Sequence, residues 1–482
     1  MPVVHHGLIV ILFFHSVLTN QGSRMNSTSK VGRRSFLKMT AFSLGCGSLT
    51  NAFQQLSAES KFDSQALSYG PLSPVEDQAT GLPLLELPEG FRYSTFCWSR
   101  DEMSDGTITP GAHDGMGVIQ DDSGILTLCR NHELSGSTAA FGPSAIQYDE
   151  TVGGGCSMLQ FDAGQGVWLD ARPALSGTVR NCAGGPTPWN SWLSCEETVD
   201  GPVDENKSDE MTHGWIFEVP AEGVTNALPL KDMGRFVHEA IAVDPDTGIV
   251  YETEDRGTAG LYRFLPRTPG KLAEGGQLQM LQVKGQMDLR KSDSVGIKYD
   301  CQWVTIDDPC RAHADTEKQD QLGCYSQGKA KGATTFARLE GCWYGNGLIY
   351  FDSTSGGPKS AGQIWQYDPK EEQLMLLFAS PSNKVLDQPD NLAVSPRGGI
   401  VLCEDGREKP QRLHGLTPDG KLFTFARNNV RLQGERNGFK GDFRGSEWAG
   451  STFSPDGKWL FVNLQTPGIT FAITGPWGSG LL

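Results

Sequence analysis

The chain has 482 residues, of which 38% are apolar and 20% charged, and a formal net charge of −16. This length is enough for one large all-β domain or two ordinary domains, and the composition is that of a soluble globular protein. A chain with this much negative charge would repel the phosphate backbone, which excludes binding of nucleic acid through general electrostatic attraction. Clustered carboxylates could instead be neutralised by divalent or trivalent cations, although surface acid that only maintains solubility is the alternative.

The N-terminal residues predict an export signal. Gly32–Lys38 reads GRRSFLK and is followed by an apolar stretch, Met39–Leu49. Together they resemble a twin-arginine export signal of bacteria. The apolar run Leu8–Phe14 lies upstream of the arginine pair and is too short to span a membrane. The start of translation is therefore open between Met1 and Met25.

This signal sets the expected domain organisation and location. We expect residues 1–53 to be the signal region, 54–81 a polar linker rich in Ser and Gln, and 82–482 a single folded domain. The partner implied is the twin-arginine export machinery, and the location is periplasmic or secreted. No later segment is apolar enough to cross a bilayer. Disulfides can form in an exported protein, and Cys301, Cys310 and Cys324 are close enough in sequence to pair.

The high glycine content, 59 residues, and the scarcity of helical periodicity favour many short strands. Val118–Leu128 predicts a strand, an Asp-Asp-Ser-Gly turn and a second strand. It ends in Cys129–Glu133, which places His132 and Glu133 where a loop begins. These two residues are either part of a site or a polar strand end that faces water.

A chemically unusual stretch is Asn181–Glu197, NCAGGPTPWNSWLSCEE. We interpret Trp189–Ser194 as a short strand that has Cys182 near one end and Glu196 and Glu197 at the other. A folding core does not require adjacent glutamates after a half-apolar strand, whereas a metal site does. The alternative is a turn with a buried thiol and a solvated acidic pair.

A loose repeat runs through the rest of the chain. Ala240–Asp255, Leu392–Asp405 and Ser451–Leu464 each contain an apolar strand, a turn with Pro and Gly, and a second apolar strand. Gly362–Asp368 and Leu413–Phe425 are candidates for outer strands. Such units predict a β-propeller, in which the first strand of each blade faces the central channel. Residues at corresponding blade positions would then converge near one end of that channel.

Acidic residues recur at the starts and ends of these predicted strands. Period-two alternation puts Glu252 and Glu254 on one face, followed by Asp255. The residues at or just before an apolar strand are Glu239, Glu340, Asp390 with Asn391, and Glu447. Their recurrence indicates a convergent carboxylate cluster, against the alternative of separate solvated strand ends.

Such a cluster requires positive charge, because packed carboxylates cannot all stay ionised. Oxygen ligands suit calcium or magnesium, and carboxylates with one thiolate suit iron better than zinc. The sequence has no HExxH, no CxxC pair and no convincing Ser-His-Asp set. Arg338 shares a face with Glu340 and is a candidate clamp for a transferring phosphoryl group, unless it only pairs with an acid.

The ordered motifs NCAGGPTPWNSWLSCEE, HEAIAVDPDTGIVYETEDR, FARLEG, LDQPDNLAVSP and SEWAGSTFSPDG resemble those of the PhoX-type alkaline phosphatases. The resemblance runs from about Ala112 to Trp477. It implies a six-bladed β-propeller, a monomer that is exported, and hydrolysis of phosphate monoesters. It also implies two ferric ions and calcium ions joined through a bridging oxygen, with a cysteine thiolate on iron.

The resemblance also implies roles for individual residues. Cys182 matches the iron-binding thiolate, Glu239 and Glu340 match bridging carboxylates, and Arg338 matches the phosphate-binding arginine. The residues implied as calcium or supporting positions are Glu196, Glu197, Glu254, Asp255, Asp390, Asn391 and Glu447. The chain is shorter between its motifs than the larger phosphatases of the family. Two other functions stay open, a calcium-dependent propeller hydrolase such as a lactonase and a non-catalytic binding propeller.

Overall fold

The computed structural model describes residues 68–136, 138–202, 211–312, 322–478 and 481–482. The predicted signal region, with its twin arginine, lies outside them. Within these ranges the secondary structure is β except for one α-helix and short 3-10 helices: α2 (Gly323–Ala330), η1 (Ser144–Ile146), η3 (Lys231–Met233) and η4 (Leu272–Glu274). None of the described helices has the length and apolar character needed to cross a bilayer.

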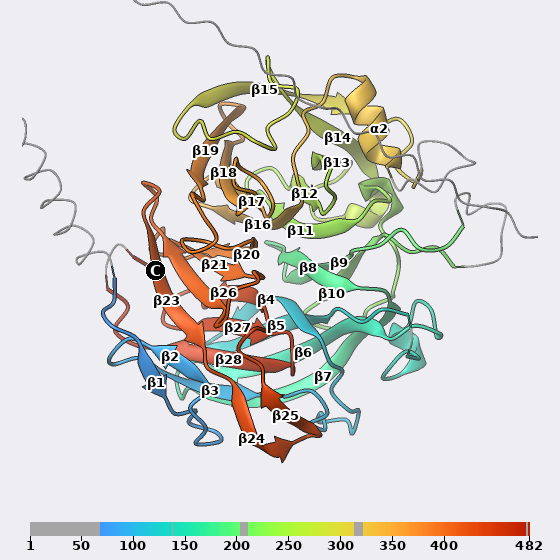
Figure 1. Cartoon of the computed structure of the whole chain (residues 1–482). Coiled ribbons are helices and arrows are strands. Elements are labelled where there is room, and N and C mark those ends of the chain that lie inside the picture. The colour runs from blue at the N-terminus through green and yellow to red at the C-terminus, as the bar shows by residue number, and fades with distance from the viewer. Residues whose placement is uncertain (1–67, 137, 203–210, 313–321, 479–480) are drawn as a thin grey trace, which may run out of the picture. The chain divides into compact units, whose positions relative to one another are not determined.

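The strands form antiparallel sheets in which neighbours in the chain mostly pair with each other (Figure 1). Two four-stranded sheets are β4 (His113–Asp122), β5 (Ile125–His132), β6 (Gly154–Asp162), β7 (Val167–Thr178), and β26 (Trp448–Phe453), β27 (Leu460–Leu464), β28 (Ile469–Thr474), β3 (Arg92–Phe96). A three-stranded sheet contains β8 (Asn181–Pro186), β9 (Ser191–Glu196) and β10 (Ile216–Pro220).

The remaining sheets are larger or smaller than four strands. A six-stranded sheet contains β20 (Pro389–Val394), β21 (Ile400–Glu404), β22 (Arg412–Leu416), β23 (Leu422–Asn428), β2 (Leu85–Leu87) and β1 (Ser73–Val75). A nine-stranded sheet joins β11 (His238–Val243), β12 (Val250–Glu254), β13 (Leu261–Pro266), β14 (Gly276–Val283), β15 (Lys298–Thr305) to β19 (Gln373–Ala379), β18 (Gln363–Asp368), β17 (Leu348–Ser353), β16 (Leu339–Gly345). A hairpin is formed by β24 (Arg431–Arg436) and β25 (Phe439–Asp442).

The strands β4, β8, β11, β16, β20 and β26 lie around the centre and contact one another in that order, and β26 contacts β4 again (Figure 1). We refer to them as the inner strands. The expected all-β, propeller-like arrangement is confirmed. Because each inner strand has two others as neighbours, side chains near the same end of these strands converge.

An early strand and a late strand of the described chain meet in one sheet. β28 pairs with β3 along its whole length, from Thr470 opposite Phe96 to Thr474 opposite Arg92. The ring of sheets is therefore closed by hydrogen bonds between an early and a late strand. In this way the first and last sheets of the ring are held together by a strand pairing rather than by side-chain packing alone.

The predicted repeat turns are present in the structure. In three of the inner hairpins the glycine N–H donates to a carbonyl three or four residues earlier at 2.8 Å, namely Gly248 to Asp244, Gly398 to Ser395 and Gly457 to Ser454. The glycines have φ of 72°, 94° and 70°, a left-handed conformation that glycine adopts without steric cost. The turn chemistry of the sequence therefore sets the hairpins.

The apolar core lies between the faces of the sheets. Against the nine-stranded sheet, the buried ring of Phe336 packs edge-on on Phe351 and Trp365, with centroids 5.8 and 5.7 Å apart. Buried aromatic side chains contribute roughly 1.5–3 kcal/mol each through apolar burial. This packing fixes the sheets that carry the inner strands.

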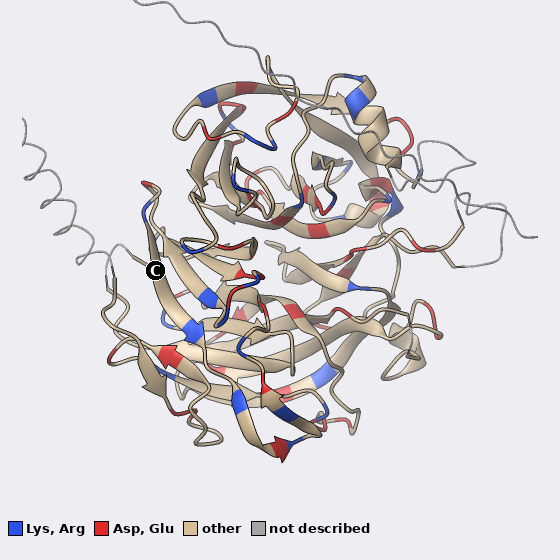
Figure 2. Cartoon of the chain, viewed as in Figure 1, with Lys and Arg blue, Asp and Glu red and all other residues tan. Residues whose placement is uncertain are grey.

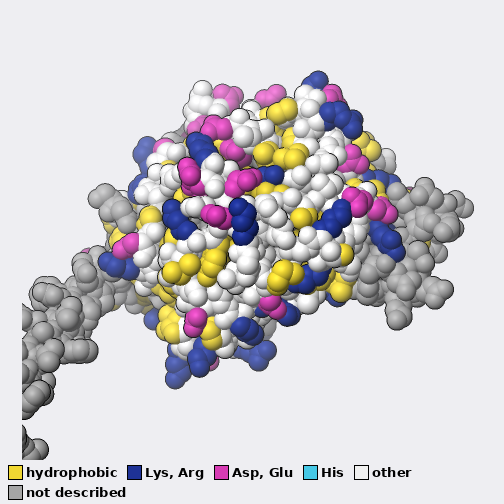
Figure 3. Space-filling view, turned by 90° about the horizontal axis from the view of Figure 1, so that it is seen from above, with side chains coloured by type: hydrophobic (Ala, Val, Ile, Leu, Met, Phe, Trp, Pro, Cys, Tyr) yellow, Lys and Arg dark blue, Asp and Glu magenta, His cyan; other side chains and the backbone are white. Residues whose placement is uncertain are grey.

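Two sequence expectations concern the periphery of the fold. β1 pairs with β2 and lies before Leu82, where the folded domain was expected to begin. Cys301 and Cys324, for which a disulfide was left open, carry free thiols. On the face shown in Figure 3, acidic and basic side chains are scattered among uncharged ones.

The inner strands approach one another closely at glycines. A Cβ added at Gly115 would lie 2.5 Å from Cα of Ala183, and one at Gly185 would lie 2.1 Å from the carbonyl oxygen of Ile241. Only glycine fits such a backbone approach. These contacts join β4 to β8 and β8 to β11 directly beside the residues described next.

Candidate active site on the inner strands

The second residue of an inner strand is chemically functional in five of the six inner strands. In each, the pairing with the following strand has a register irregularity at that point. Bulges of this kind redirect a side chain and are common next to active sites. The residues are Asp114, Cys182, Glu239, Glu340 and Asp390.

A further polar position lies directly after the strand that pairs with each inner strand. In all six blades, the backbone N–H at this position donates to the carbonyl oxygen of the residue directly before the inner strand. These residues are Glu133, Glu197, Asp255, Thr354, Asp405 and Gln465. Each blade therefore directs side chains from two strands to the same end of the ring, and Asp and Glu residues recur around the centre in Figure 2.

Side chains of neighbouring sheets anchor the bulged backbone. Asn131 Nδ2 donates to the carbonyl oxygen of Cys182 at 3.3 Å and to that of Ala183 at 2.7 Å. Thr253 Oγ1 donates to the carbonyl oxygen of Glu340 at 2.6 Å. These bonds satisfy carbonyls that the irregular ladder leaves without a strand partner. The functional side chains are thus held on a rigid frame.

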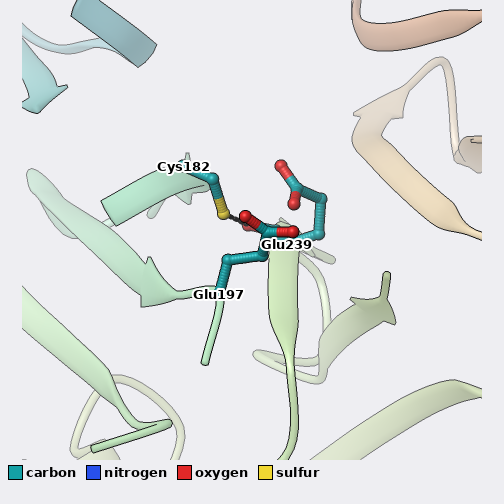
Figure 4. Close-up of side chains that lie close together, drawn as sticks. All are labelled: Cys182, Glu197 and Glu239. Carbon is teal, nitrogen blue, oxygen red and sulfur yellow. Dashed lines mark hydrogen bonds between the residues drawn. The ribbon is translucent and has the colours of Figure 1, made fainter. Parts of the chain in front are cut away.

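One group of candidate ligands consists of Cys182, Glu197 and Glu239, whose ligand atoms all lie within 4.8 Å of one another (Figure 4). Burial raises the pKa of Cys182 and of Glu239 well above the usual values, and the neighbouring carboxylates add to the effect. Burial also raises the pKa of Glu197 to about 9, although Arg180 opposes this. Without a cation these groups would retain protons, and a bound cation would favour their ionised forms.

A second group consists of Asp114, Glu133 and Glu447, again with ligand atoms within 4.8 Å. Gln465 Nε2 donates to Glu133 at 2.7 Å and to Glu447, and lies 3.5 Å from Asp114. Burial raises the pKa of all three carboxyls, with further increases from neighbouring carboxylates. Gln465 is neutral and Arg180 bonds only Glu133 of the three, so all three carboxylates can stay ionised together only if further positive charge is bound.

Arg338 lies between two acids at the edge of the cluster. Its Nε and Nη2 donate to the two carboxylate oxygens of Asp255 at 2.9 and 3.0 Å, and Nη2 also donates to Glu340. The pairing with Glu340 that the sequence left as an alternative is therefore formed. Nη1 makes no hydrogen bond within the described ranges, and the side chain is 36% exposed. The guanidinium retains a donor for a ligand.

The remaining carboxyls connect these parts. Glu340 accepts from Thr354 Oγ1 at 2.8 Å and lies beside Asp390. Burial raises the pKa of Glu340 well above its usual value, and Asp255 and Asp390 raise it further. Burial likewise raises the pKa of Asp390.

Three predicted ligands have protein partners instead. Both carboxylate oxygens of Glu196 accept hydrogen bonds from the protein, from Val179 N, His213 Nδ1, Gly214 N and Trp215 N. Glu254 Oε2 accepts from Gly260 N and Tyr262 Oη, both at 2.9 Å, while its Oε1 has no hydrogen-bond partner among the described residues. Asn391 Oδ1 accepts from Ser451 N at 3.2 Å. Neither carboxylate group described above includes them, because alternation turns these side chains away from their functional neighbours.

Several residues of the cluster were not predicted as site residues from the sequence. These are Asp114, Glu133, Arg180, Asp405 and Gln465. Their positions in the hairpins could have identified them. Arg180 directly precedes an inner strand, and Asp114 is the second residue of one. Glu133, Asp405 and Gln465 directly follow the strands that pair with inner strands. Identifying these positions requires the strand boundaries, which the sequence repeat locates only approximately.

Comparison with solved structures shows a similar fold in Pseudomonas fluorescens PhoX in complex with vanadate, a transition-state analogue. The TM-score is 0.60 at 17% identity over 84% of this chain and 98% of that one. A gluconolactonase from Xanthomonas campestris matches with TM-score 0.38 and 12% identity over 84% and 98% of the two chains. A 6-phosphogluconolactonase-like protein from Bacteroides uniformis matches with TM-score 0.34 and 12% identity over 72% and 76%.

Comparison at the level of sequence gives a family assignment. No curated protein matches the chain. The family model for alkaline phosphatase PhoX matches residues 67–174 and 170–468, which is most of the described chain. The expected enzyme class, a phosphatase, is thereby confirmed, and the chain belongs to the PhoX family of alkaline phosphatases.

Proposed function

We propose that this phosphatase hydrolyses phosphate monoesters with ferric and calcium ions bound by the inner-strand cluster. The observation that carries the proposal is the buried group of Cys182, Glu197 and Glu239. Glu239 is 5% exposed, and its carboxylate makes no hydrogen bond or ion pair with a described residue. A buried carboxylate without a partner is costly unless it binds a cation.

The donor types fit the two metals. A thiolate beside carboxylates suits iron, and carboxylate oxygens alone suit calcium. We assign Cys182, Glu239 and Glu340 to iron. We assign calcium or supporting roles to Glu197, Asp255, Asp390 and Glu447, and add Asp114 and Glu133 because they lie with Glu447. Glu196, Glu254 and Asn391 are left out of this set because their side chains bond groups outside the cluster, such as His213, Tyr262 and Ser451.

The protein's own residues bind and orient the phosphate. Asp255 and Glu340 hold the guanidinium of Arg338 in place, so that its remaining nitrogen, Nη1, can donate to a phosphate oxygen. This positive charge stabilises the charge that builds up on the phosphoryl oxygens in the transition state. Bound cations would supply further positive charge and lower the pKa of a water molecule. No serine nucleophile is required.

The proposal includes finer features of the molecule. The cyclic order of the inner strands supports six blades. We further propose export through the twin-arginine signal at Gly32–Lys38, a periplasmic or secreted location, and a monomeric enzyme. Cell fractionation of the wild type and of a variant with both arginines of that signal replaced by lysine tests the export route.

The central test is metal content in Cys182→Ala. We expect this variant to lose iron, and to hydrolyse p-nitrophenyl phosphate at least about tenfold more slowly. Cys195→Ala is the matched control, because Cys195 is equally buried on the next strand but lies outside the ligand group. Unchanged iron and activity in Cys182→Ala would remove the thiolate from the site.

A further inference from the structure

We propose that Arg180 is a second anion-binding arginine, which contacts the substrate phosphate together with Arg338. This inference rests on the proposed function, in which Arg338 binds that phosphate. It adds a residue for which the sequence motifs predict no role. The ligand class is a tetrahedral oxyanion with at least two negatively charged oxygens, such as a phosphate monoester dianion.

Arg180 and Arg338 occupy equivalent places in two blades. Each directly precedes an inner strand, β8 or β16, and each has a left-handed backbone, with φ of 51° and 46°. The carbonyl oxygen of each accepts at 2.9 Å from the residue after the following strand, Glu197 or Thr354. A left-handed conformation is uncommon for a non-glycine residue. The same backbone geometry therefore aims both side chains.

The two guanidinium groups are also held in the same way. Arg180 Nε and Nη2 donate to Glu133 at 3.3 and 3.0 Å, and Nη2 also donates to Glu197. Arg338 likewise uses Nε and Nη2 for two acids, Asp255 and Glu340. In both, Nη1 makes no hydrogen bond with any residue that the structure describes. The side chains are 43% and 36% exposed, so a ligand can reach both arginines from solvent.

The position of Arg180 places it within the cluster. It bonds Glu197 of one ligand group and Glu133 of the other. Glu197 in turn lies beside Asp255, the partner of Arg338. The two arginines therefore flank one carboxylate pair. Two fixed guanidinium groups can each donate to one oxygen of a single phosphate.

A purely neutralising role for Arg180 predicts a different behaviour. A lysine ammonium would balance Glu133 and Glu197 as well as a guanidinium would. Only the planar fork can hold two carboxylates and still present a third nitrogen in a fixed direction. Replacement by lysine therefore separates the two roles.

The experiment measures inhibition of the metal-loaded enzyme by vanadate and by inorganic phosphate. The variants are Arg180→Gln, Arg180→Lys and Arg338→Gln, with iron and calcium content and melting temperature measured on each. We expect both Arg180 variants to raise the inhibition constants about tenfold, with metal content unchanged. Arg412→Gln is the control, because Arg412 pairs with the buried Glu404 on other strands and should leave inhibition unchanged.

The outcomes separate this inference from the proposed function. Wild-type inhibition constants in Arg180→Lys, or weaker inhibition that only accompanies metal loss, would reduce Arg180 to a neutralising residue. Unchanged inhibition in Arg338→Gln would overturn the role of Arg338 while leaving an effect of Arg180 as support for anion binding there. No change in either arginine's variants would overturn both.

Discussion

Glu196 and Glu197 are consecutive residues whose carboxylates have opposite surroundings. Glu196 accepts hydrogen bonds from His213 Nδ1 at 2.7 Å and from Gly214 N at 2.8 Å. Glu197 instead bonds Arg180 and lies in the candidate ligand group. Because strand residues alternate, one glutamate supports the fold and the next faces the site.

The first prediction is that the two glutamates affect different measurements. Glu197→Gln should lose metal and most phosphatase activity, with a smaller change in stability of the metal-free protein. Glu196→Gln should lower the free energy of unfolding by about 2–4 kcal/mol, since it breaks a buried network of charged hydrogen bonds. Elemental analysis and denaturant unfolding of both variants check this. Equal metal loss in both would contradict the assignment of Glu196.

The second prediction concerns metal removal. Treatment with chelators for calcium and iron should abolish phosphatase activity and lower the melting temperature, because the buried carboxyls lose their counter-charge. At a free metal concentration of 100 times Kd, binding contributes about 2.7 kcal/mol of stability. Calorimetry before and after chelation, with restoration by iron and calcium, measures the effect. A chelated enzyme that retains both activity and melting temperature contradicts a metal-dependent mechanism.

The third prediction is a pH-dependent gain in stability for Glu252→Gln. Burial raises the pKa of Glu252 well above its usual value. Neither carboxylate oxygen has a hydrogen-bond partner among the described residues, and His238 Nδ1 lies 3.7 Å from one of them. The folded state therefore binds more protons than the unfolded state, so stability falls as pH rises above the unfolded pKa. The variant's advantage should grow with pH by up to about 1.4 kcal/mol per unit until the folded pKa is reached.

Glu404→Gln is the control of opposite sign. Burial opposes ionisation of Glu404, but His414 and Arg412 outweigh it and lower its pKa. The ionised form then contributes stability above the unfolded pKa, and this contribution is lost as pH falls through the folded pKa. The variant should be less stable than the wild type at pH 7, and the difference should disappear in acid. Urea unfolding from pH 2.5 to 9 compares each variant with the wild type. A stability difference that does not change with pH would refute the prediction for that variant.

The fourth prediction is that Gly115→Ala disrupts the site through the backbone. Its Cβ would lie 2.5 Å from Cα of Ala183 and 2.8 Å from the carbonyl oxygen of Cys182, so β4 and β8 must separate. Overpacking of this kind costs roughly 1–3 kcal/mol. We also expect reduced iron binding because Cys182 moves. Gly434→Ala is the control, since nothing lies within 4 Å of an added Cβ there.

The sequence predicts the fold well where turn chemistry is explicit. The turns that end in Gly248, Gly398 and Gly457 mark hairpins whose first strands are inner strands, and this places Glu239 and Asp390 correctly at inner-strand starts. It is less accurate around Cys182. The predicted strand Trp189–Ser194 is β9 (Ser191–Glu196), and Cys182 lies in a separate strand, β8.

Other parts of the site depend on register that the sequence does not reveal. Whether Glu196 or Glu197 faces the cluster depends on where β9 ends, and a one-residue shift reverses the answer. Asp114 is difficult to recognise because β4 begins at His113, before the apolar run that indicates a strand. Arg180 precedes its inner strand just as Arg338 does, but this equivalence appears only once both strands are located.

The pairing of β28 with β3 has a consequence for synthesis of the enzyme. Arg92–Phe96 can pair only after Ile469–Thr474 has been made, so the intervening hairpins are synthesised before the ring can close. This pairing joins strands that are far apart in the sequence, and such contacts pay the largest loop-closure entropy and slow folding. Ring closure is therefore expected to be a late step in the folding of this chain.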